Sequence, residues 1–443
     1  MSEIIEPRVL KGFRDYLPQD EMTRRALMEV LETVFRSYGF VPIDTPALEY
    51  AEILLGKGGG ETDKQVYRFQ DKGGRDVALR FDLTVPFARF MAEHVDELYL
   101  PFRRYHMAKV WRGENTQRGR YREFMQCDFD IVGTDSASAD TDIVLLIADA
   151  IAALDVGGFT IRINHRGIFN RFLEAAGVRD KSTAVLRLVD KLEKLGAVQV
   201  AKLLAEEIGE ATAARVLDFV SREESFEATL AKIEGLAGGP AEDSRRLREI
   251  GLNAREAGFP GALVLDPSIT RGLDYYTGVV FETNLDAMPE IGSVCSGGRY
   301  DELASLYTTR RLPGVGSSIG LDRLLAALET LGRIKRRSGY TQVLILAVEE
   351  SLSPSYHRIA RALRAGSIAA EVFPEKRKLA QQFSYAERKG IPLAVILGTE
   401  ESAGGKAQIR DLGSRESSLV PFAAGDSSAL LARARELLSQ TGR

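Results

Sequence analysis

The sequence has only two cysteines among its 443 residues, Cys127 and Cys295, and no Cys-X-X-Cys spacing. A disulfide framework and a structural zinc site therefore have little support, and a reducing cytoplasm fits this composition. The four histidines are scattered, with no pair at His-X-His or His-X-X-X-His spacing. We therefore expect no zinc and no catalytic metal site built from histidines.

Long hydrophobic runs are also missing from the chain. No stretch of about 18 apolar residues occurs, and the N-terminus lacks the apolar core of a signal peptide. We therefore predict a cytoplasmic protein without a membrane partner. The 59 basic and 63 acidic side chains leave a net charge of -4, which argues against a DNA partner but allows a local basic groove.

What remains is the composition of a globular protein, with 44% hydrophobic and 28% charged residues. At about 150 residues per domain, the length predicts about three domains. The first part favours a helix over 21–38, a strand over 76–84 and two strands over 104–112 and 124–132 that form a long hairpin. In the second hairpin strand, Gln126, Asp128 and Asp130 share one face, which predicts a polar pocket floor.

A glycine-rich stretch, 56–60, has neither the Gly-Lys-Ser/Thr ending of a phosphate loop nor a dinucleotide-fold context, so a mobile surface loop is the better interpretation. Residues 170–260 have helical periodicity and predict a helical insertion. Strand patterns return over 270–282 and 293–303, and 314–331 runs from small residues into a helix. After a basic linker, residues 341–443 alternate between strand and helix, which predicts a mostly parallel sheet.

Arginines gather beside the polar strand face. Arg112, Arg118, Arg120 and Arg122 occupy the loop between the hairpin strands, and Arg271 and Arg323 stand in turn-like settings elsewhere. Guanidinium groups bind phosphate oxygens bidentately, so this arrangement indicates a nucleotide site. Ion pairing on a solvated surface is the alternative for any single arginine.

These residues belong to motifs that resemble one family, the histidyl-tRNA synthetases of class II. The motifs shared by the class are the helix and strand that lead to Pro46, VWRGENTQRGRYREFMQCDFDIVG at 110–133 and GVGSSIGLDRL at 314–324. Two signatures are peculiar to the histidine enzymes, RGLDYYTG at 271–278 and SGGRYD at 296–301, and the segment LRFDLTVPFAR at 79–89 accompanies them. The resemblance covers nearly the whole chain.

The resemblance implies an α+β catalytic domain over 1–330, built on an antiparallel class II sheet and including the helical insertion at about 170–260. A linker over 331–340 would lead to an anticodon-binding α/β domain over 341–443. It also implies a homodimer, because the region around the first helix forms the subunit interface in this class.

The resemblance further implies an activity, in which L-histidine and ATP give histidyl-adenylate and pyrophosphate, and histidine then passes to tRNA(His). Mg²⁺ would bind with the nucleotide, through protein ligands that the sequence does not identify. Arg112 and Arg271 would be catalytic. Histidine would be bound by Asp82, Leu83, Thr84, Arg112, Gln126, Asp130, Arg271, Tyr275 and Tyr276, and ATP by Arg112, Glu114, Arg120 and Arg323.

For the two tyrosines a core role is the alternative, because neighbours in a strand point to opposite faces. Contacts with tRNA are expected from the basic loop over 118–122 and from Lys376, Arg377, Lys378, Gln381 and Gln382 in the C-terminal domain. That loop and Asp82 differ from many bacterial members, which have a proline-containing loop and glutamate. Both features resemble another branch of the family.

Two other functions compete with this interpretation. One is a catalytically inactive, synthetase-like regulatory protein of histidine biosynthesis, but such proteins usually lack the anticodon domain and the active-site arginines. The other is a class II synthetase for a different amino acid, which the segments at 271–278 and 296–301 disfavour.

Overall fold

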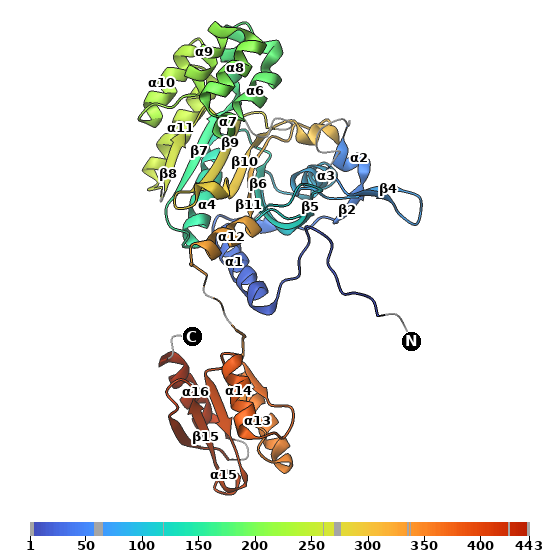
Figure 1. The fold of residues 1–443 in the computed structure, drawn as a ribbon, viewed down its shortest axis with the longest axis vertical. Helices are drawn as coiled ribbons and strands as arrows, with labels where there is room; N and C mark the ends of the chain where they lie inside the picture. Colours follow the sequence, from blue (N-terminus) through green and yellow to red (C-terminus); the bar gives the residue numbers. More distant parts are fainter. Residues whose placement is uncertain are drawn as a thin grey trace. The chain divides into compact units, whose positions relative to one another are not determined.

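The computed structural model describes residues 4–56, 65–117, 119–259, 261–269, 276–334, 336, 338–423 and 426–440. The chain divides into two compact units (Figure 1). The first consists of Met1–Asp15 and Ala26–Ile334, and the second of Tyr16–Arg25 and Lys335–Arg443. The glycine-rich stretch beyond Gly56 lies outside the described residues.

An eight-stranded sheet with the order β1-β5-β6-β11-β10-β9-β7-β8 organises the first unit. Its five inner pairings, from β5 to β7, are antiparallel, whereas β1 joins β5 and β8 joins β7 in parallel. The predicted antiparallel sheet is therefore confirmed, with parallel edges. The strands are β1 (Val41–Pro42), β5 (Phe102–Trp111), β6 (Glu123–Val132), β7 (Phe159–His165), β8 (Ala262–Leu265), β9 (Val279–Leu285), β10 (Cys295–Tyr300) and β11 (Gly314–Gly320).

Three helices, α1 (Pro18–Ser37), α4 (Ala137–Ala153) and α12 (Leu321–Thr330), contribute to the core of this unit. Leu31 and Phe35 of α1 and Ile147 of α4 are fully buried, as is Phe129 of β6. The β6 side chains at 127, 129 and 131 all enter this core. The side chains between them are consequently left for the opposite face of the sheet, as the alternation of the sequence predicts.

A smaller sheet, β2-β4-β3, packs beside two helices. It consists of β2 (Leu48–Tyr50), β3 (Arg68–Gln70) and β4 (Asp76–Leu79), and the helices are α2 (Ala51–Leu55) and α3 (Thr84–His94), followed by the short turn Val95–Glu97. The strand predicted over 76–84 is thus wrong beyond Leu79. Asp82 Oδ1 accepts the N–H of Val85 at 3.1 Å, so this carboxylate satisfies a donor in the first turn of α3 and favours a helix start.

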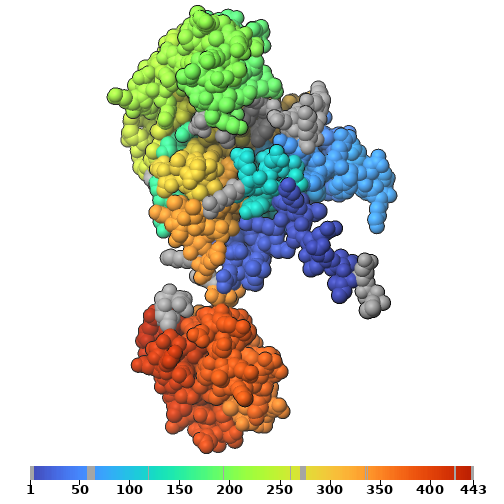
Figure 2. Space-filling model, in the orientation of Figure 1, coloured from blue at the N-terminus to red at the C-terminus, as the bar shows by residue number. Residues whose placement is uncertain are grey.

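The helical insertion lies between β7 and β8 in the chain, and Figure 2 shows its green surface. Phe172 and Phe219 stack in its interior with ring centroids 4.4 Å apart. Arg171 and Asp243, which both belong to the insertion, form an ion pair at 2.8 Å. Its helices are α5 (Arg166–Ala175), α6 (Ser182–Val189), α7 (Leu192–Leu195), α8 (Ala197–Ile208), α9 (Glu210–Val220), α10 (Phe226–Leu236) and α11 (Glu242–Glu256).

The second unit contains a five-stranded sheet with the order β13-β12-β14-β15-β16. Only the first three strands are parallel; β15 and β16 form an antiparallel hairpin, so the prediction of a mostly parallel sheet is wrong for half of its pairings. The strands are β12 (Val343–Ile345), β13 (Ala370–Val372), β14 (Leu393–Ile396), β15 (Lys406–Asp411) and β16 (Ser417–Pro421), and the helices are α13 (Ser353–Ala365), α14 (Leu379–Arg388), α15 (Thr399–Ala403) and α16 (Ser428–Gln440). Within the described part of the chain, no helix has the length and apolar character needed to cross a membrane.

Candidate active site

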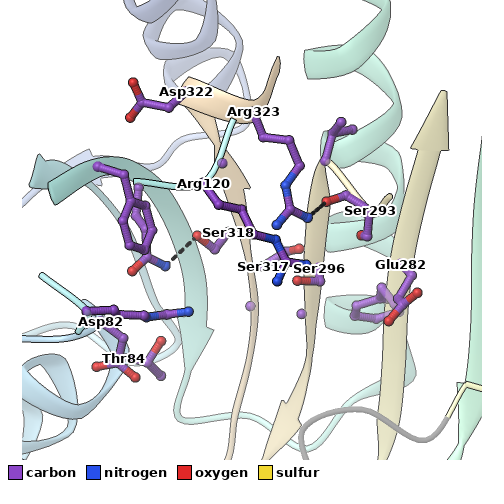
Figure 3. Close-up of a pocket in the computed structure, with 18 of the residues that line it drawn as sticks. Asp82, Thr84, Arg120, Glu282, Ser293, Ser296, Ser317, Ser318, Asp322 and Arg323 are labelled. Atoms are coloured by element: carbon purple, nitrogen blue, oxygen red, sulfur yellow. Dashed lines mark hydrogen bonds between the residues drawn. The ribbon is translucent and has the colours of Figure 1, made fainter. Parts of the chain in front are cut away.

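A cavity of about 360 Å³ opens over the polar face of the large sheet. Its floor comes from β6, β9, β10 and β11, and its walls come from the loop after β5, the start of α3 and the start of α12. Figure 3 shows Asp82 and Thr84 at one end of this pocket, and Arg120 and Arg323 above a group of serines toward the other. The serines are Ser293, Ser296, Ser317 and Ser318.

The pocket brings together nine of the residues that the sequence assigns to histidine or ATP: Asp82, Thr84, Arg112, Glu114, Arg120, Gln126, Asp130, Tyr276 and Arg323. Leu83 is fully buried and does not belong to the lining, so any contact it makes with a ligand is left to its backbone. Arg271 and Tyr275 lie outside the described residues, as does Arg118.

Asp130 sits in a gap that the strand register creates. Across the sheet it is opposite Arg104 of β5 on one side and Gly316 of β11 on the other. A Cβ at position 316 would lie 2.0 Å from Asp130 Oδ1, so only glycine leaves space for this carboxylate. Through that space Asp130 reaches the hydroxyl of Tyr300 on β10, which donates to Oδ1 at 2.5 Å.

A second glycine clears the floor beneath Tyr276. A Cβ at Gly298 would lie 2.6 Å from the carbonyl oxygen of Val279 and 3.0 Å from Tyr276 Cδ1. A side chain also fixes the Tyr276 backbone, because Arg166 Nη1 donates to the carbonyl oxygen of Tyr276 at 2.6 Å. Gly298, from the segment at 296–301, and Gly316, from the segment at 314–324, thus leave room for side chains that line the pocket.

Three buried carboxyl groups lie at or beside this end of the pocket: Asp82 and Asp130 belong to the lining, and Asp128 lies between Gln126 and Asp130 on β6. Burial raises the pKa of Asp82 to about 6, against the opposing N–H of Val85 and the charge of Arg112. Burial likewise raises the pKa of Asp128 to about 7, and it raises that of Asp130, with Arg104 opposing both shifts. Neutral polar groups lie beside them: Gln126 Nε2 donates to Ser318 Oγ at 2.8 Å.

Arginines line the pocket both beside Asp82, where Arg112 lies, and toward the other end, where Figure 3 shows Arg120 and Arg323. Arg112 Nε donates to the carbonyl oxygen of Phe81 at 2.8 Å, and its guanidinium lies 5.2 Å from the centroid of the Phe124 ring. Arg323 Nη1 donates to the carbonyl oxygen of Ser293 at 2.5 Å. Since backbone atoms hold both side chains in place, their guanidinium groups can serve an anionic ligand without a large loss of side-chain entropy.

Several residues of the site were not singled out from the sequence. Arg104 and Tyr300 flank Asp130, and Glu282 and the four serines line the floor. Asp322 accepts the N–H of Met125 at 2.7 Å and Arg14 Nη2 at 2.6 Å. The signal for Tyr300 was present in the segment at 296–301, whereas Arg104 belongs to none of the quoted motifs.

The C-terminal residues expected at tRNA behave differently from one another. Gln382 is fully buried, and its amide bonds both the N–H and the carbonyl of Ala347 at 2.9 Å, so its predicted role in binding RNA is wrong. Lys376 lies at the surface, 3.0 Å from Glu349. Arg377 pairs with Glu375.

The pocket can therefore hold a molecule with one polar, hydrogen-bonding end and one strongly anionic end. Clusters of three or more histidine, cysteine, aspartate or glutamate side chains suited to a metal ion are absent from the described residues.

Comparison with known proteins identifies the family to which this pocket belongs. The family model described as histidyl-tRNA synthetase matches residues 12–324, which include all of the pocket lining. The chain belongs to the histidyl-tRNA synthetase family. The resemblance inferred from the motifs is thereby confirmed, and the model of an anticodon binding domain matches residues 342–425.

Relatives within this family are similar over most of the chain. A histidine-tRNA ligase of Treponema denticola is 56% identical, covering 90% of both chains. One of Rhodopirellula baltica is 49% identical, covering 97% of this chain and 98% of the relative. The crystal structure of a histidyl-tRNA synthetase from Nostoc sp. PCC 7120 superposes with a TM-score of 0.87 at 33% identity, covering 99% of this chain and all of the other.

Proposed function

We propose that this protein is a histidine-tRNA ligase, which activates L-histidine with ATP and transfers it to the 3′ end of tRNA(His). The observation that carries the proposal is a single pocket with Asp82 and Thr84 at one end and Arg120 and Arg323 toward the other. An amino acid fits the first end and a triphosphate the second. Membership of the family supports the same assignment.

In the first step, a carboxylate oxygen of histidine attacks the α-phosphorus of ATP, and the bond to the bridging oxygen breaks to release pyrophosphate. Two anions must approach each other in this attack. Arg112 and Arg271 would neutralise the charge that builds on the α-phosphate, and Arg323 would hold the outer phosphates. Arg120 and Glu114 would bind the rest of the nucleotide, and their place in the pocket lining supports this role.

Histidine itself is recognised through charge and hydrogen bonds. Asp82, Thr84 and Gln126 would hold the α-amino group, and Asp130 and Tyr276 would read the imidazole, with Tyr275 as their neighbour. A buried carboxylate that needs an N–H donor rejects side chains without one, because such a ligand leaves it unsatisfied. Asp82 and Asp130 both belong to the pocket lining, which supports this assignment.

We infer that Mg²⁺ enters together with ATP. The ion takes oxygen ligands and retains water, so phosphate oxygens can supply much of its shell. Glu282 is a carboxylate of the pocket lining on the floor strand β9, and its oxygens suit such an ion. When bound, Mg²⁺ would offset phosphate charge during the attack.

In the second step, a terminal ribose hydroxyl of tRNA attacks the carbonyl carbon of the adenylate and AMP leaves. The loop between β5 and β6, which contains Arg120 and Arg122, would meet the acceptor end. The anticodon would be read by the second unit, in agreement with the anticodon-binding model matched there. Gln381, unlike Gln382, is exposed and remains available for such a contact.

We further propose a homodimer in the cytoplasm. Val41 of the edge strand β1 and Leu48 and Tyr50 of β2 are large apolar side chains at least 41% exposed. Apolar surface of this kind at a sheet edge favours association with a second copy.

Exchange of labelled pyrophosphate into ATP, measured with Mg²⁺ and each standard amino acid in turn, tests the proposal. We expect exchange with histidine alone, followed by charging of tRNA(His). No exchange with any amino acid by folded protein would favour the regulatory alternative. Exchange with another amino acid would contradict the roles given to Asp130 and Tyr276.

A further inference from the structure

A fully buried arginine lies beside Asp130, the carboxylate to which the proposed function gives the recognition of the imidazole. Arg104 has no exposed surface, and its Nη2 lies 2.7 Å from Asp130 Oδ2. The contact is an ion pair rather than a well-aligned hydrogen bond, since none of the guanidinium nitrogens completes a hydrogen bond to a described residue. On its other side the guanidinium lies 4.0 Å from the centroid of the Phe87 ring.

Such a burial needs an explanation, because an arginine loses its hydration when it enters a protein core. The aromatic face of Phe87 and a single carboxylate offset only part of that cost. Replacing a buried ion pair by apolar side chains is often neutral or stabilising, so stability alone does not require Arg104. A role in the chemistry of the pocket is the better explanation.

The carboxylates around Arg104 indicate what its role in the pocket is. Asp130 is faced by Arg104 from β5, by Asp128 from its own strand and by Tyr300 from β10, while β11 offers only Gly316. Asp82, before α3, adds a further negative charge near Asp128. Burial raises the pKa of all three carboxyls, and Arg104 is the largest opposing influence on Asp128 and Asp130.

We propose that Arg104 is a positioning residue for the selection of histidine, which holds the Asp130 carboxylate ionised and oriented so that it accepts a hydrogen bond from the imidazole N–H. The inference rests on the proposed function of Asp130. Tyr300 fixes Oδ1 from one side and Arg104 fixes Oδ2 from the other. Without the positive charge, a buried aspartate becomes protonated and offers the imidazole a donor where an acceptor is needed.

The sign of the pH dependence follows from this arrangement. Arg104 lowers the pKa of Asp130 against the effect of burial, so its removal raises that pKa further. The ionised, binding-competent fraction then falls at acid pH and recovers as the pH increases. A purely structural defect would instead weaken the binding of histidine and ATP together, at every pH.

The experiment measures KM for histidine and for ATP in pyrophosphate exchange, near pH 6.5 and near pH 8.5, for wild type, R104Q and R104K. For R104Q we expect the histidine KM to increase about tenfold over wild type near pH 6.5, and this ratio to fall about threefold or more near pH 8.5. R104K keeps the charge and should stay within about threefold at both values. Ratios to wild type cancel the titration of histidine's own ring.

The matched control is R103Q, on the same strand. Arg103 points to the other face and pairs with Asp142 at 2.6 Å, so its replacement should leave both KM values unchanged. A histidine KM of R104Q that is unchanged, or raised by the same factor at both pH values, overturns the proposal. Absence of histidine exchange in the wild type would contradict the proposed function instead.

If R104Q does not fold, the histidine KM of R104K tests the proposal instead. A folded R104K with a histidine KM close to wild type at both pH values supports a requirement for charge at this position. An R104K that folds but shows a histidine KM raised about tenfold at both values overturns the proposal, because the charge would then be insufficient.

Discussion

Gly316 and Asp130 are neighbours on adjacent strands, and the missing side chain of the glycine is the space that the carboxylate occupies. A Cβ at position 316 would stand 2.0 Å from Asp130 Oδ1 and 2.7 Å from the carbonyl oxygen of Phe129. Backbone atoms of a central strand cannot move aside easily. The floor of the pocket therefore depends on a glycine at this position.

Replacement of Gly316 by alanine should displace Asp130 and weaken histidine binding more than ATP binding. We expect the histidine KM to increase about tenfold to a hundredfold, equivalent to about 1.4 to 2.8 kcal/mol of lost binding free energy. Pyrophosphate exchange over a range of histidine concentrations measures it. G235A is the control, since no described atom lies within 4 Å of a Cβ there. A G316A enzyme with wild-type KM would show that Asp130 is not constrained by this contact.

Neutralising Asp128 should stabilise the protein at alkaline pH. Burial raises the pKa of Asp128 to about 7 from its ordinary value near 4, so the folded protein binds this proton more tightly than the unfolded chain. Wild-type stability therefore declines as the pH rises between these values. The amide that D128N introduces does not titrate, and we expect this variant to be more stable by about 1 to 3 kcal/mol near pH 8 but unchanged near pH 4.

Urea unfolding of wild type and D128N across this pH range measures the difference. Equal midpoints at pH 8, or a gain that is the same near pH 4, would mean that Asp128 is not the group whose ionisation opposes folding. Histidine exchange by D128N provides a second readout of whether the neighbouring Gln126 keeps its geometry.

The sequence predicted those parts of the site that depend on local periodicity. The hairpin of β5 and β6 and the polar face of β6 follow from alternation within one segment, which a sequence displays directly. The same rule failed over 80–83, where the alternation continues but Asp82 starts a helix by accepting the N–H of Val85. Local patterns do not show whether a polar residue continues a strand or ends it.

Contacts between distant segments were beyond a single sequence. Asp130 and Tyr300 are separated by 170 positions, and the relation of Arg104 to Gly316 exists only once the strand order is known. Gln382 was misjudged for a similar reason, because its amide is buried against Ala347 rather than exposed. The sequence shows that a side chain is polar, but it does not show which hydrogen-bond partner that side chain has in the fold.

Removing the guanidinium of Arg323 should weaken ATP binding and activation. Arg323 lines the pocket and is anchored to the Ser293 carbonyl, so it is ready to receive phosphate oxygens. For R323A we expect kcat/KM for ATP to fall about a hundredfold, or about 2.7 kcal/mol, with a smaller effect on the histidine KM. R333A is the control, since Arg333 contacts the carbonyl of Asp155 instead. Equal losses for both substrates would contradict a phosphate-specific role.

Asp322 should couple the N-terminal segment to the catalytic strand. One oxygen accepts the N–H of Met125 at 2.7 Å, and the other accepts Arg14, whose guanidinium also lies 4.1 Å from the centroid of the Tyr121 ring. Because Asp322 is only 2% exposed, D322N leaves donors facing an amide and should lower the unfolding free energy by about 1 to 3 kcal/mol.

A double-mutant cycle with R14M separates the ion pair from the backbone bond. We expect a coupling energy of about 1 kcal/mol between positions 14 and 322, because Arg14 remains partly solvated and screening reduces the pair's contribution. The ATP KM should rise in both single variants, since Tyr121 belongs to the pocket loop that Arg14 supports. Additive effects within about 0.3 kcal/mol would show that the backbone bond of Met125, rather than the ion pair, anchors this wall of the pocket.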